Sequence, residues 1–197
     1  MDNLVKMFVD SNPNCMFSGG AIGADRLFGL MCKETNTPYI HFSFDDHDSE
    51  EDNLLRIPDS NLIESTEIYN SLNKANTVLK RKIPYRKSYV YKLLARNRYQ
   101  ILFTESVYAI VSIETPNTVS GGTAWAIQMY IDQCRERNIP AKIYVFCLKK
   151  YKPFYYNNET GEFEECASVP RPTGLWTGIG SRKCTAMNLE QFRGYFV

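Results

Sequence analysis

Residues 14–25 read NCMFSGGAIGAD, a short apolar run that stops at a glycine pair and continues in small residues typical of a helix start. A strand that turns at glycines into a helix leaves several backbone N–H groups unpaired at one point, and the helix dipole adds partial positive charge there. Such a corner suits a phosphate or another anion. Gly-Gly turns also occur where a helix simply packs closely on a strand, so this stretch alone leaves both interpretations open.

Two further stretches follow the same pattern. Residues 107–113 (VYAIVSI) are apolar and β-rich, and Gly121-Gly122-Thr123 then leads into a helical pattern. Near the C-terminus, residues 175–179 (LWTGI) run into Gly180-Ser181-Arg182. If one parallel sheet holds all three strands, its carboxyl edge gathers three glycine turns and one arginine, and open α/β sheets bind their ligands at this edge.

The composition is that of one globular domain. The chain has 197 residues, of which 44% are hydrophobic and 23% charged, and its formal net charge is +1. A chain of this length buries most of its unfolded surface in a core, and a charge near zero gives no global attraction for nucleic acid or membranes. No apolar run reaches the ~18 residues of a membrane span, and the first residues lack the pattern of a secretory signal. We therefore expect a single domain over residues 1–197, in the cytoplasm, with no membrane partner.

The potential metal ligands form no recognisable site. The six cysteines are scattered without a C-x-x-C pair, which is typical of reduced, buried thiols, and only His41 and His47 offer imidazoles. The acidic run at residues 45–52 (DDHDSEED) has the ligands of a hard cation, but it lacks a glycine at ligand-loop spacing and is more typical of a solvated loop. The sequence predicts no metal and no cofactor.

The order of the predicted elements indicates an α/β fold. Residues 14–44 form a strand–helix–strand unit of the size of a right-handed parallel crossover. Residues 53–77 are weakly helical, residues 142–148 are a buried strand, and residues 151–166 read as an antiparallel hairpin. We expect one three-layer domain with a mainly parallel sheet and a small C-terminal β-hairpin.

A basic segment covers residues 80–98. It interleaves tyrosines with eight cations and no acid: Lys80, Arg81, Lys82, Arg86, Lys87, Lys92, Arg96 and Arg98. Such a segment suits phosphates or single-stranded nucleic acid. It is equally the solvated face of a helix, because Val90, Leu93, Leu94 and Tyr99 form an inward stripe. We expect most of these charges at the surface. Arg96 and Asn97 should lie nearest the glycine turns, where a ligand would bind.

Four stretches together carry a resemblance: SGGAIGAD (18–25), ARNR (95–98), SGGTAWAIQ (120–128) and WTGIGSR (176–182). They resemble motifs of the SLOG superfamily, Rossmann-like proteins related to the lonely-guy phosphoribohydrolases and to DNA-processing protein A, with many phage-encoded members. In most relatives the GIGSR-type strand comes first, whereas here it lies at about residues 175–180. The resemblance thus implies a circular permutation, which is tolerated where chain ends lie close together. It places residues 175–179 in the sheet between residues 15–17 and 107–113.

The resemblance implies a nucleotide or nucleotide-derived ligand across this sheet edge. The first glycine turn would approach its ribose or phosphate, the second would hold a phosphate at a helix start, and Ser181 with Arg182 would close the site. Glycine is needed in these turns because a Cβ would hold the backbone N–H donors away from the phosphate oxygens. Arginine can donate two parallel hydrogen bonds to one phosphate. Asp25 fits a ribose contact or a helix-start charge equally well. The implied ligand-binding set is Ser18, Gly19, Gly20, Ala21, Asp25, Arg96, Asn97, Gly121, Gly122, Thr123, Gly180, Ser181 and Arg182.

The function that the resemblance implies is binding: a protein that senses or sequesters a nucleotide signal, as SLOG-like domains are thought to do in bacterial immunity and its phage countermeasures. The first alternative is hydrolysis of an N-glycosidic bond, as in the lonely-guy relatives, whose PGGxGTxxE motif carries a glutamate that aids attack at the sugar. Here SGGTAWAIQ ends at Gln128, and an amide cannot act as a general base. Asp25, Glu64 or Glu114 could substitute, so hydrolysis stays open without an assigned catalytic residue.

A second alternative is binding of single-stranded DNA, as in DNA-processing protein A. It rests on residues 80–98 and predicts a steep dependence of affinity on salt. The near-zero net charge speaks against it. Relatives often self-associate, so we also expect a homo-oligomer.

Overall fold

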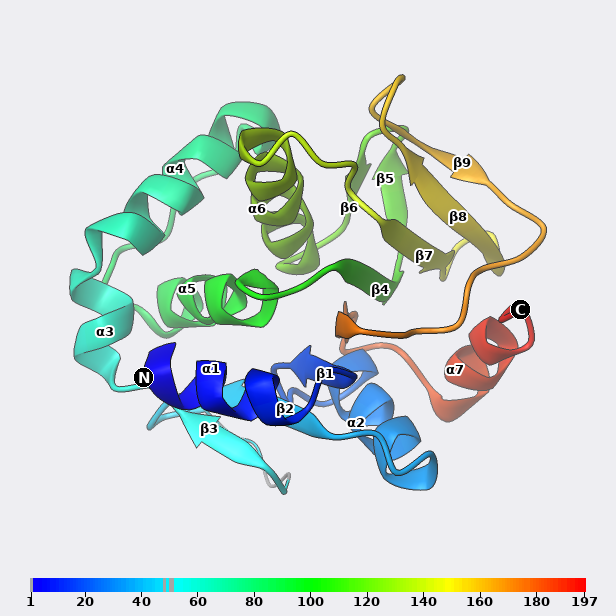
Figure 1. The fold of residues 1–197 in the computed structure, drawn as a ribbon. Coiled ribbons are helices and arrows are strands. Elements are labelled where there is room, and N and C mark those ends of the chain that lie inside the picture. The colour runs from blue at the N-terminus through cyan, green and yellow to red at the C-terminus, as the bar shows by residue number, and fades with distance from the viewer. Residues whose placement is uncertain (1, 48, 50–51) are drawn as a thin grey trace.

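The structure is a computed structural model that describes residues 2–47, 49 and 52–197. A central eight-stranded sheet organises these residues (Figure 1). In the order in which they lie side by side, its strands are β3 (Leu54–Arg56), β2 (Tyr39–Ser43), β1 (Cys15–Ser18), β10 (Leu175–Gly180), β4 (Ser106–Val111), β7 (Ile143–Cys147), β8 (Lys152–Asn157) and β9 (Glu162–Glu165). The strands from β3 to β7 are parallel, and β8 and β9 continue the sheet antiparallel. The predicted α/β fold with a mainly parallel sheet is confirmed.

The C-terminal strand β10 lies in the middle of the sheet. Its Leu175 pairs with Cys15 of β1 on one side, and its Trp176 pairs with Ser106 of β4 on the other. Both faces of β10 are covered, with Trp176 in the apolar cluster of one face and Ile179 in that of the other. The predicted place of residues 175–179, between the strands at 15–17 and 107–113, is therefore confirmed.

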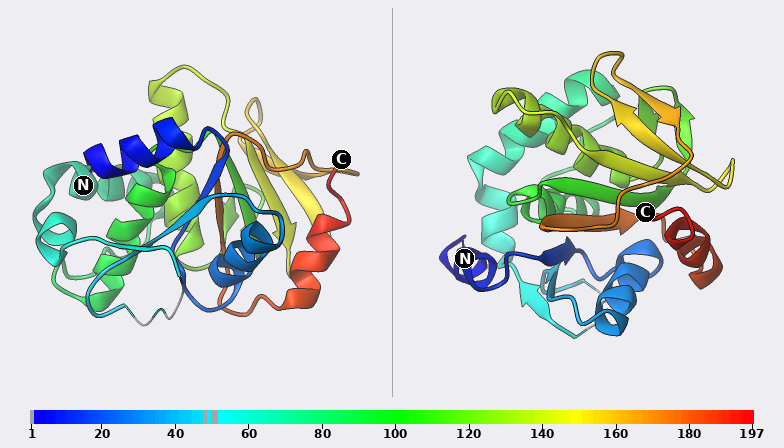
Figure 2. Two further views of the ribbon diagram at one scale, coloured as in Figure 1. Left: turned by 60° about the horizontal axis from the view of Figure 1, so that its bottom comes forward. Right: turned by 45° about the vertical axis from the view of Figure 1, so that its right-hand side comes forward.

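Helices cover both faces of the sheet (Figure 2). Adjacent strand residues point to opposite faces, so Phe17 packs in one apolar cluster and Met16 in the other. The cluster that contains Phe17 is covered by α1 (Asp2–Ser11), α3 (Asp59–Glu64), α4 (Thr66–Leu79), α5 (Tyr89–Ile101) and α6 (Thr123–Glu136). The cluster that contains Met16 is covered by α2 (Ala24–Glu34) and α7 (Ala186–Arg193). These are the three predicted layers.

The structure corrects two local predictions. Residues 54–56, expected within a weakly helical stretch, form the edge strand β3, in which Leu54 pairs with His41. Residues 107–113, expected as one strand, divide between β4, which ends at Val111, and β5 (Ile113–Thr115), which forms a second small hairpin with β6 (Thr118–Val119). The strands β3, β5 and β6 each have three residues or fewer, too few for a hydrophobic period to show. The hairpin expected at 151–166 is present as β8 and β9.

The acidic run at 45–52 lies partly outside the described residues, because 48, 50 and 51 are not described. Within the described part of the chain, no group of three or more metal-ligating side chains gathers at one point. All six cysteines are unbridged. No helix in the described ranges is both long and apolar enough to cross a bilayer.

The helices at the two chain ends lie on opposite faces of the sheet. Val5 of α1 packs in one apolar cluster, whereas Leu189 and Phe192 of α7 pack in the other. Joining the two ends would therefore not produce one continuous helix between β10 and β1. The circular permutation stays a prediction.

Candidate functional site

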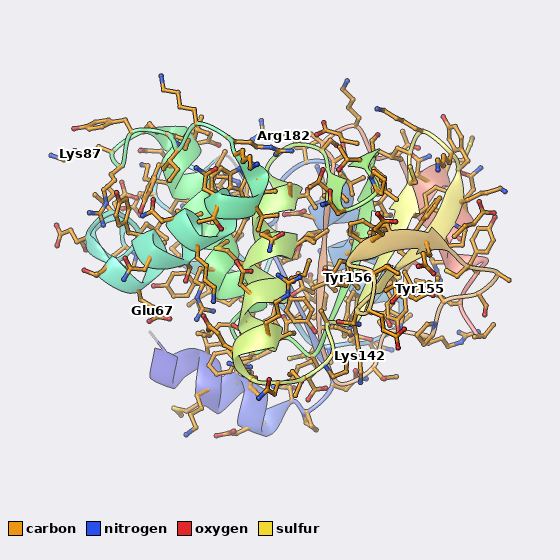
Figure 3. The ribbon with its side chains drawn as sticks, turned by 90° about the horizontal axis from the view of Figure 1, so that it is seen from above. Glu67, Lys87, Lys142, Tyr155, Tyr156 and Arg182 are labelled. Atoms are coloured by element: carbon orange, nitrogen blue, oxygen red, sulfur yellow. The ribbon has the colours of Figure 1, made fainter. Side chains whose placement is uncertain are left out.

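A cavity of about 620 Å³ lies where the three glycine turns meet. Its lining includes Ala21 from the first turn, residues 120–123 from the second and residues 179–182 from the third. Figure 3 shows Arg182 at the opposite end of the molecule from Lys142, which directly precedes β7. Because β10, β4 and β7 are parallel, Arg182 and the third turn lie at their carboxyl ends.

Most of the predicted ligand-binding residues line this cavity. Those that do are Ala21, Asp25, Arg96, Asn97, Gly121, Gly122, Thr123, Gly180, Ser181 and Arg182. Ser18, Gly19 and Gly20 are not among its lining residues and are buried behind it. Ser18 Oγ donates a hydrogen bond to the backbone oxygen of Asp25, 3.4 Å away. The three turns converge, and their role toward a ligand stays a prediction.

Asp25 joins the first turn to the third. Its Oδ2 accepts a hydrogen bond from the Gly19 N–H (3.1 Å), and its Oδ1 accepts one from the Gly180 N–H (3.2 Å). Only 6% of Asp25 is exposed, and Arg96 Nη2 lies 3.8 Å from Oδ2. Burial raises the pKa of the Asp25 carboxyl, while the Arg96 guanidinium and the two backbone donors oppose that rise. Asp25 therefore has a role beyond a favourable interaction with the dipole of its own helix. Its carboxylate connects the first and third turns through hydrogen bonds.

Arg96 stands behind the first turn as a buried cation. Its Nη1 donates to the carbonyl oxygens of Gly19 and Phe42, and its Nη2 donates to Asn97 Oδ1. The guanidinium fills the space that a Cβ on Gly19 would need, so a side chain at this position would force the guanidinium to move. Burial lowers the pKa of Arg96 below its ordinary value, but a guanidinium stays protonated in proteins. The lining therefore contains a fixed positive charge next to the Asp25 carboxylate.

The second turn presents the open start of a helix. Helix α6 begins at Thr123, and no side chain of the described residues caps its N-terminus at Gly122. The loop before it is held from two sides, because Arg81 donates to the carbonyl oxygen of Gly121 (2.7 Å) and Asn97 donates to that of Gly122 (3.3 Å). Unpaired N–H groups and the helix dipole favour an anion at this point.

Two features of the lining were not predicted from the sequence. Arg81 belongs to the site through its contacts with the second turn, and Gln100 lines the cavity from α5. Leu93, Arg96, Asn97 and Gln100 share one face of α5, at the i, i+3, i+4, i+7 spacing. Polar residues at the inward positions of this helix were the signal that could have identified Gln100.

Most charges of the basic segment are not buried, and Arg96 and Asn97 line the cavity, as predicted, but the structure differs from the prediction at Lys92 and Val90. Lys92 is buried, with its Nζ 2.6 Å from Asp46 and 2.8 Å from Asp59. Val90, expected in the inward stripe, is 53% exposed. The cations of the segment that pair with acids are Arg81 with Glu114, Lys92 with Asp46 and Asp59, Arg96 with Asp25, and Arg98 with Glu67. Four of the eight cations thus pair with acids among the described residues, and Arg86 donates to the carbonyl oxygen of Ser65.

No protein-family model and no curated protein matches this chain. Among solved structures, the chain is similar to a proposed molybdenum carrier protein from Syntrophus aciditrophicus SB. The TM-score is 0.46 at 13% sequence identity, and the match covers 90% of this chain and 93% of that chain. A likeness at this level carries no argument about function.

Proposed function

We propose that this protein is a SLOG-type, Rossmann-like protein that binds a nucleotide or nucleotide-derived signalling molecule in the cavity at the carboxyl edge of its sheet. Its role would be to sense or sequester that molecule, and in a phage-encoded protein sequestration would serve counter-defence. The observation that carries the proposal is the convergence of three glycine turns, an uncapped helix start and Arg182 on one cavity.

The charges of the lining support an anionic ligand. The lining contains Arg81, Lys82, Arg96 and Arg182, against the single carboxylate of Asp25 among the described lining residues. Arg96 pairs with Asp25, and Arg81 pairs with Glu114. Lys82 and Arg182 have no acidic partner within the part of the chain that the structure describes. Two cations at the rim therefore remain to meet a phosphate.

The dimensions of the cavity support a small molecule. Ligand sites of proteins have volumes of about 300–1,000 Å³, and this cavity has about 620 Å³. Its walls combine apolar side chains, such as Val111 and Ile179, with a few polar groups. This mixture is typical of sites that hold a ring and orient it.

The positions and contacts of the candidate general bases favour ligand binding over hydrolysis. Gln128, at the position of the relatives' glutamate, is not a lining residue, and it donates to Asp132 Oδ1 (2.9 Å). Glu64 and Glu114 are also not among the lining residues. Asp25 would have to serve as the base, yet both of its oxygens already accept backbone hydrogen bonds. These hydrogen bonds give the Asp25 carboxylate a structural role and leave it poorly placed to accept a proton from a nucleophile.

The first test is the identity and fate of a bound molecule. The protein is purified, denatured, and its small-molecule content read by mass spectrometry, and the identified compound is then incubated with fresh protein. Recovery of the intact nucleotide is expected. Release of a free base would establish the hydrolase instead, and a protein that neither retains nor binds any nucleotide would refute the proposal.

Arg182→Ala provides the second test. The loss of a charge-assisted hydrogen bond costs about 1.5–3 kcal/mol, so the affinity for the nucleotide should fall about tenfold or more. Titration calorimetry measures the affinity. Lys183→Ala is the control, because it removes a neighbouring exposed cation that does not line the cavity. Equal affinities of the two variants would remove Arg182 as a phosphate contact.

A further inference from the structure

The side chain of Gln100 has hydrogen-bonding groups that find no partner among the described residues. It lines the cavity, and only 1% of it is exposed. Both Nε2 and Oε1 are buried, and neither has a hydrogen-bond partner among the residues that the structure describes. Arg96 Nε, one helical turn away on the same face of α5, is in the same condition. Folded proteins leave few buried polar atoms unpaired, because each costs free energy.

The backbone holds Gln100 in a fixed place. Its carbonyl oxygen accepts hydrogen bonds from Thr104 Oγ1 (2.8 Å) and from Thr177 Oγ1 (2.6 Å). Thr177 belongs to the central strand β10, so these bonds attach the last turn of α5 to the middle of the sheet. These bonds fix the backbone of Gln100, while no hydrogen bond from the described residues holds its buried amide, so a rotation of the side chain brings Nε2 and Oε1 to a ligand in the cavity.

The surroundings of Gln100 differ from the rim of the cavity. The buried lining residues include Val111, Trp125 and Ile179, whereas Lys82 and Arg182 are exposed. The lining therefore changes from an exposed cationic rim to a buried interior, in which apolar side chains and the Gln100 amide lie beside the paired charges of Asp25 and Arg96. A ligand that matches both parts has an anionic end and a flat, uncharged ring with hydrogen-bonding groups on its edge.

We propose that Gln100 recognises the edge of a nucleobase, donating from Nε2 and accepting at Oε1, while the phosphate of the same ligand meets Arg182 and the start of α6. This inference rests on the proposed function and adds the orientation of the ligand and the residue that reads its base. A glutamine amide makes such a paired contact with adenine, whose edge presents a neighbouring donor and acceptor.

The test compares ligands with and without a base. The affinities of AMP, GMP, CMP, UMP and ribose 5-phosphate are measured by calorimetry for the parent and for Gln100→Met, which keeps the unbranched shape but removes both polar groups. The best-bound nucleotide should exceed ribose 5-phosphate about tenfold or more in the parent, because a paired base contact has this effect. Gln100→Met should lower nucleotide affinity about tenfold and leave ribose 5-phosphate unchanged.

The controls separate this inference from the proposed function. Gln191→Met, an exposed position on α7, should bind as the parent does. Arg182→Ala should weaken both kinds of ligand. Unchanged nucleotide affinity in Gln100→Met would overturn the inference, and so would an equal loss for ribose 5-phosphate, which would mean a structural role. If ribose 5-phosphate binds as tightly as the nucleotides, the anion site stands and only base recognition fails. If none of the five binds, the proposed function itself fails.

Discussion

Asp25 accepts hydrogen bonds from two backbone N–H groups that belong to different ends of the chain. Gly19 lies six residues before it and Gly180 lies 155 residues after it. Arg96 supplies the opposite charge. Because Asp25 and Arg96 are both buried, loss of the carboxylate leaves a buried guanidinium uncompensated.

Asp25→Asn should lower the free energy of unfolding by about 3–5 kcal/mol, the usual cost of removing one partner of a buried ion pair. The amide can accept at only one of the two positions, and its NH₂ group would face a backbone donor. Urea denaturation followed by circular dichroism measures the change. Asp52→Asn is the matched control, because Asp52 pairs with Lys33 at the surface and its loss should leave stability nearly unchanged. Similar losses in the two variants would contradict the structural role of Asp25.

Among the elements, the start of α2 depends on close contact with the third turn. Gly23 precedes α2 with a φ of 97°, and the Ala24 N–H donates to the carbonyl oxygen of Ser181 (3.1 Å). A Cβ on Gly23 would overlap that same oxygen and the backbone of Arg182. The glycine thus serves both the left-handed conformation and the approach of two elements.

Gly23→Ala should therefore lower stability and also weaken the binding of AMP, because the third turn must move away from α2. Gly161→Ala isolates the conformational part of this effect: Gly161 also has a positive φ, 73°, but its Cβ would meet only ordinary contacts in the β8–β9 hairpin. We expect Gly161→Ala to cost about 1 kcal/mol of stability and to leave the affinity unchanged. Thermal unfolding and calorimetry test both variants, and an unchanged affinity in Gly23→Ala would show that the contact with Ser181 does not shape the cavity.

Across the whole molecule, the response to acid depends on two buried histidines. Burial lowers the pKa of His41 to about 3 and that of His47 to about 4, from an ordinary value of 6.5. Below pH 6.5 and above its lowered pKa, each histidine binds a proton in the unfolded chain but not in the folded chain. Stability is therefore fully present above pH 6.5 and is lost as the pH falls toward 4.

The free energy of unfolding should fall by about 1.4 kcal/mol per pH unit for each histidine in this range. Urea denaturation at a series of pH values between 7 and about 4.5 measures the slope, and stopping there limits the contribution of ordinary carboxylates. His47→Gln keeps a polar partner for Ser43 Oγ, which lies 3.1 Å from His47 Nδ1, but it cannot titrate, so the slope should halve. A slope that this substitution does not change would assign the acid sensitivity to other groups.

The elements could be predicted from the sequence where the pattern was long enough. The strands at 15–18, 106–111 and 143–147 are apolar runs that local propensity and burial specify together. The central place of β10 was predicted from the resemblance of residues 176–182 to a family motif and not from its own composition. The edge strand β3 was wrongly expected to be helical, because three residues carry no period and their pairing with β2 is a long-range interaction.

The sequence by itself determined the three glycine corners, the helix after each corner, and the α/β class, because these depend on backbone preferences and hydrophobic spacing within about ten residues. Only the tertiary structure decided that the corners line one cavity, that Asp25 is shared between Gly19 and Gly180, and that Lys92 is buried between Asp46 and Asp59. It also decided that the Gln100 amide is buried without a partner among the residues that the structure describes. These facts depend on which strands lie side by side, and that order is fixed by the packing of residues far apart in the chain, which no local pattern records.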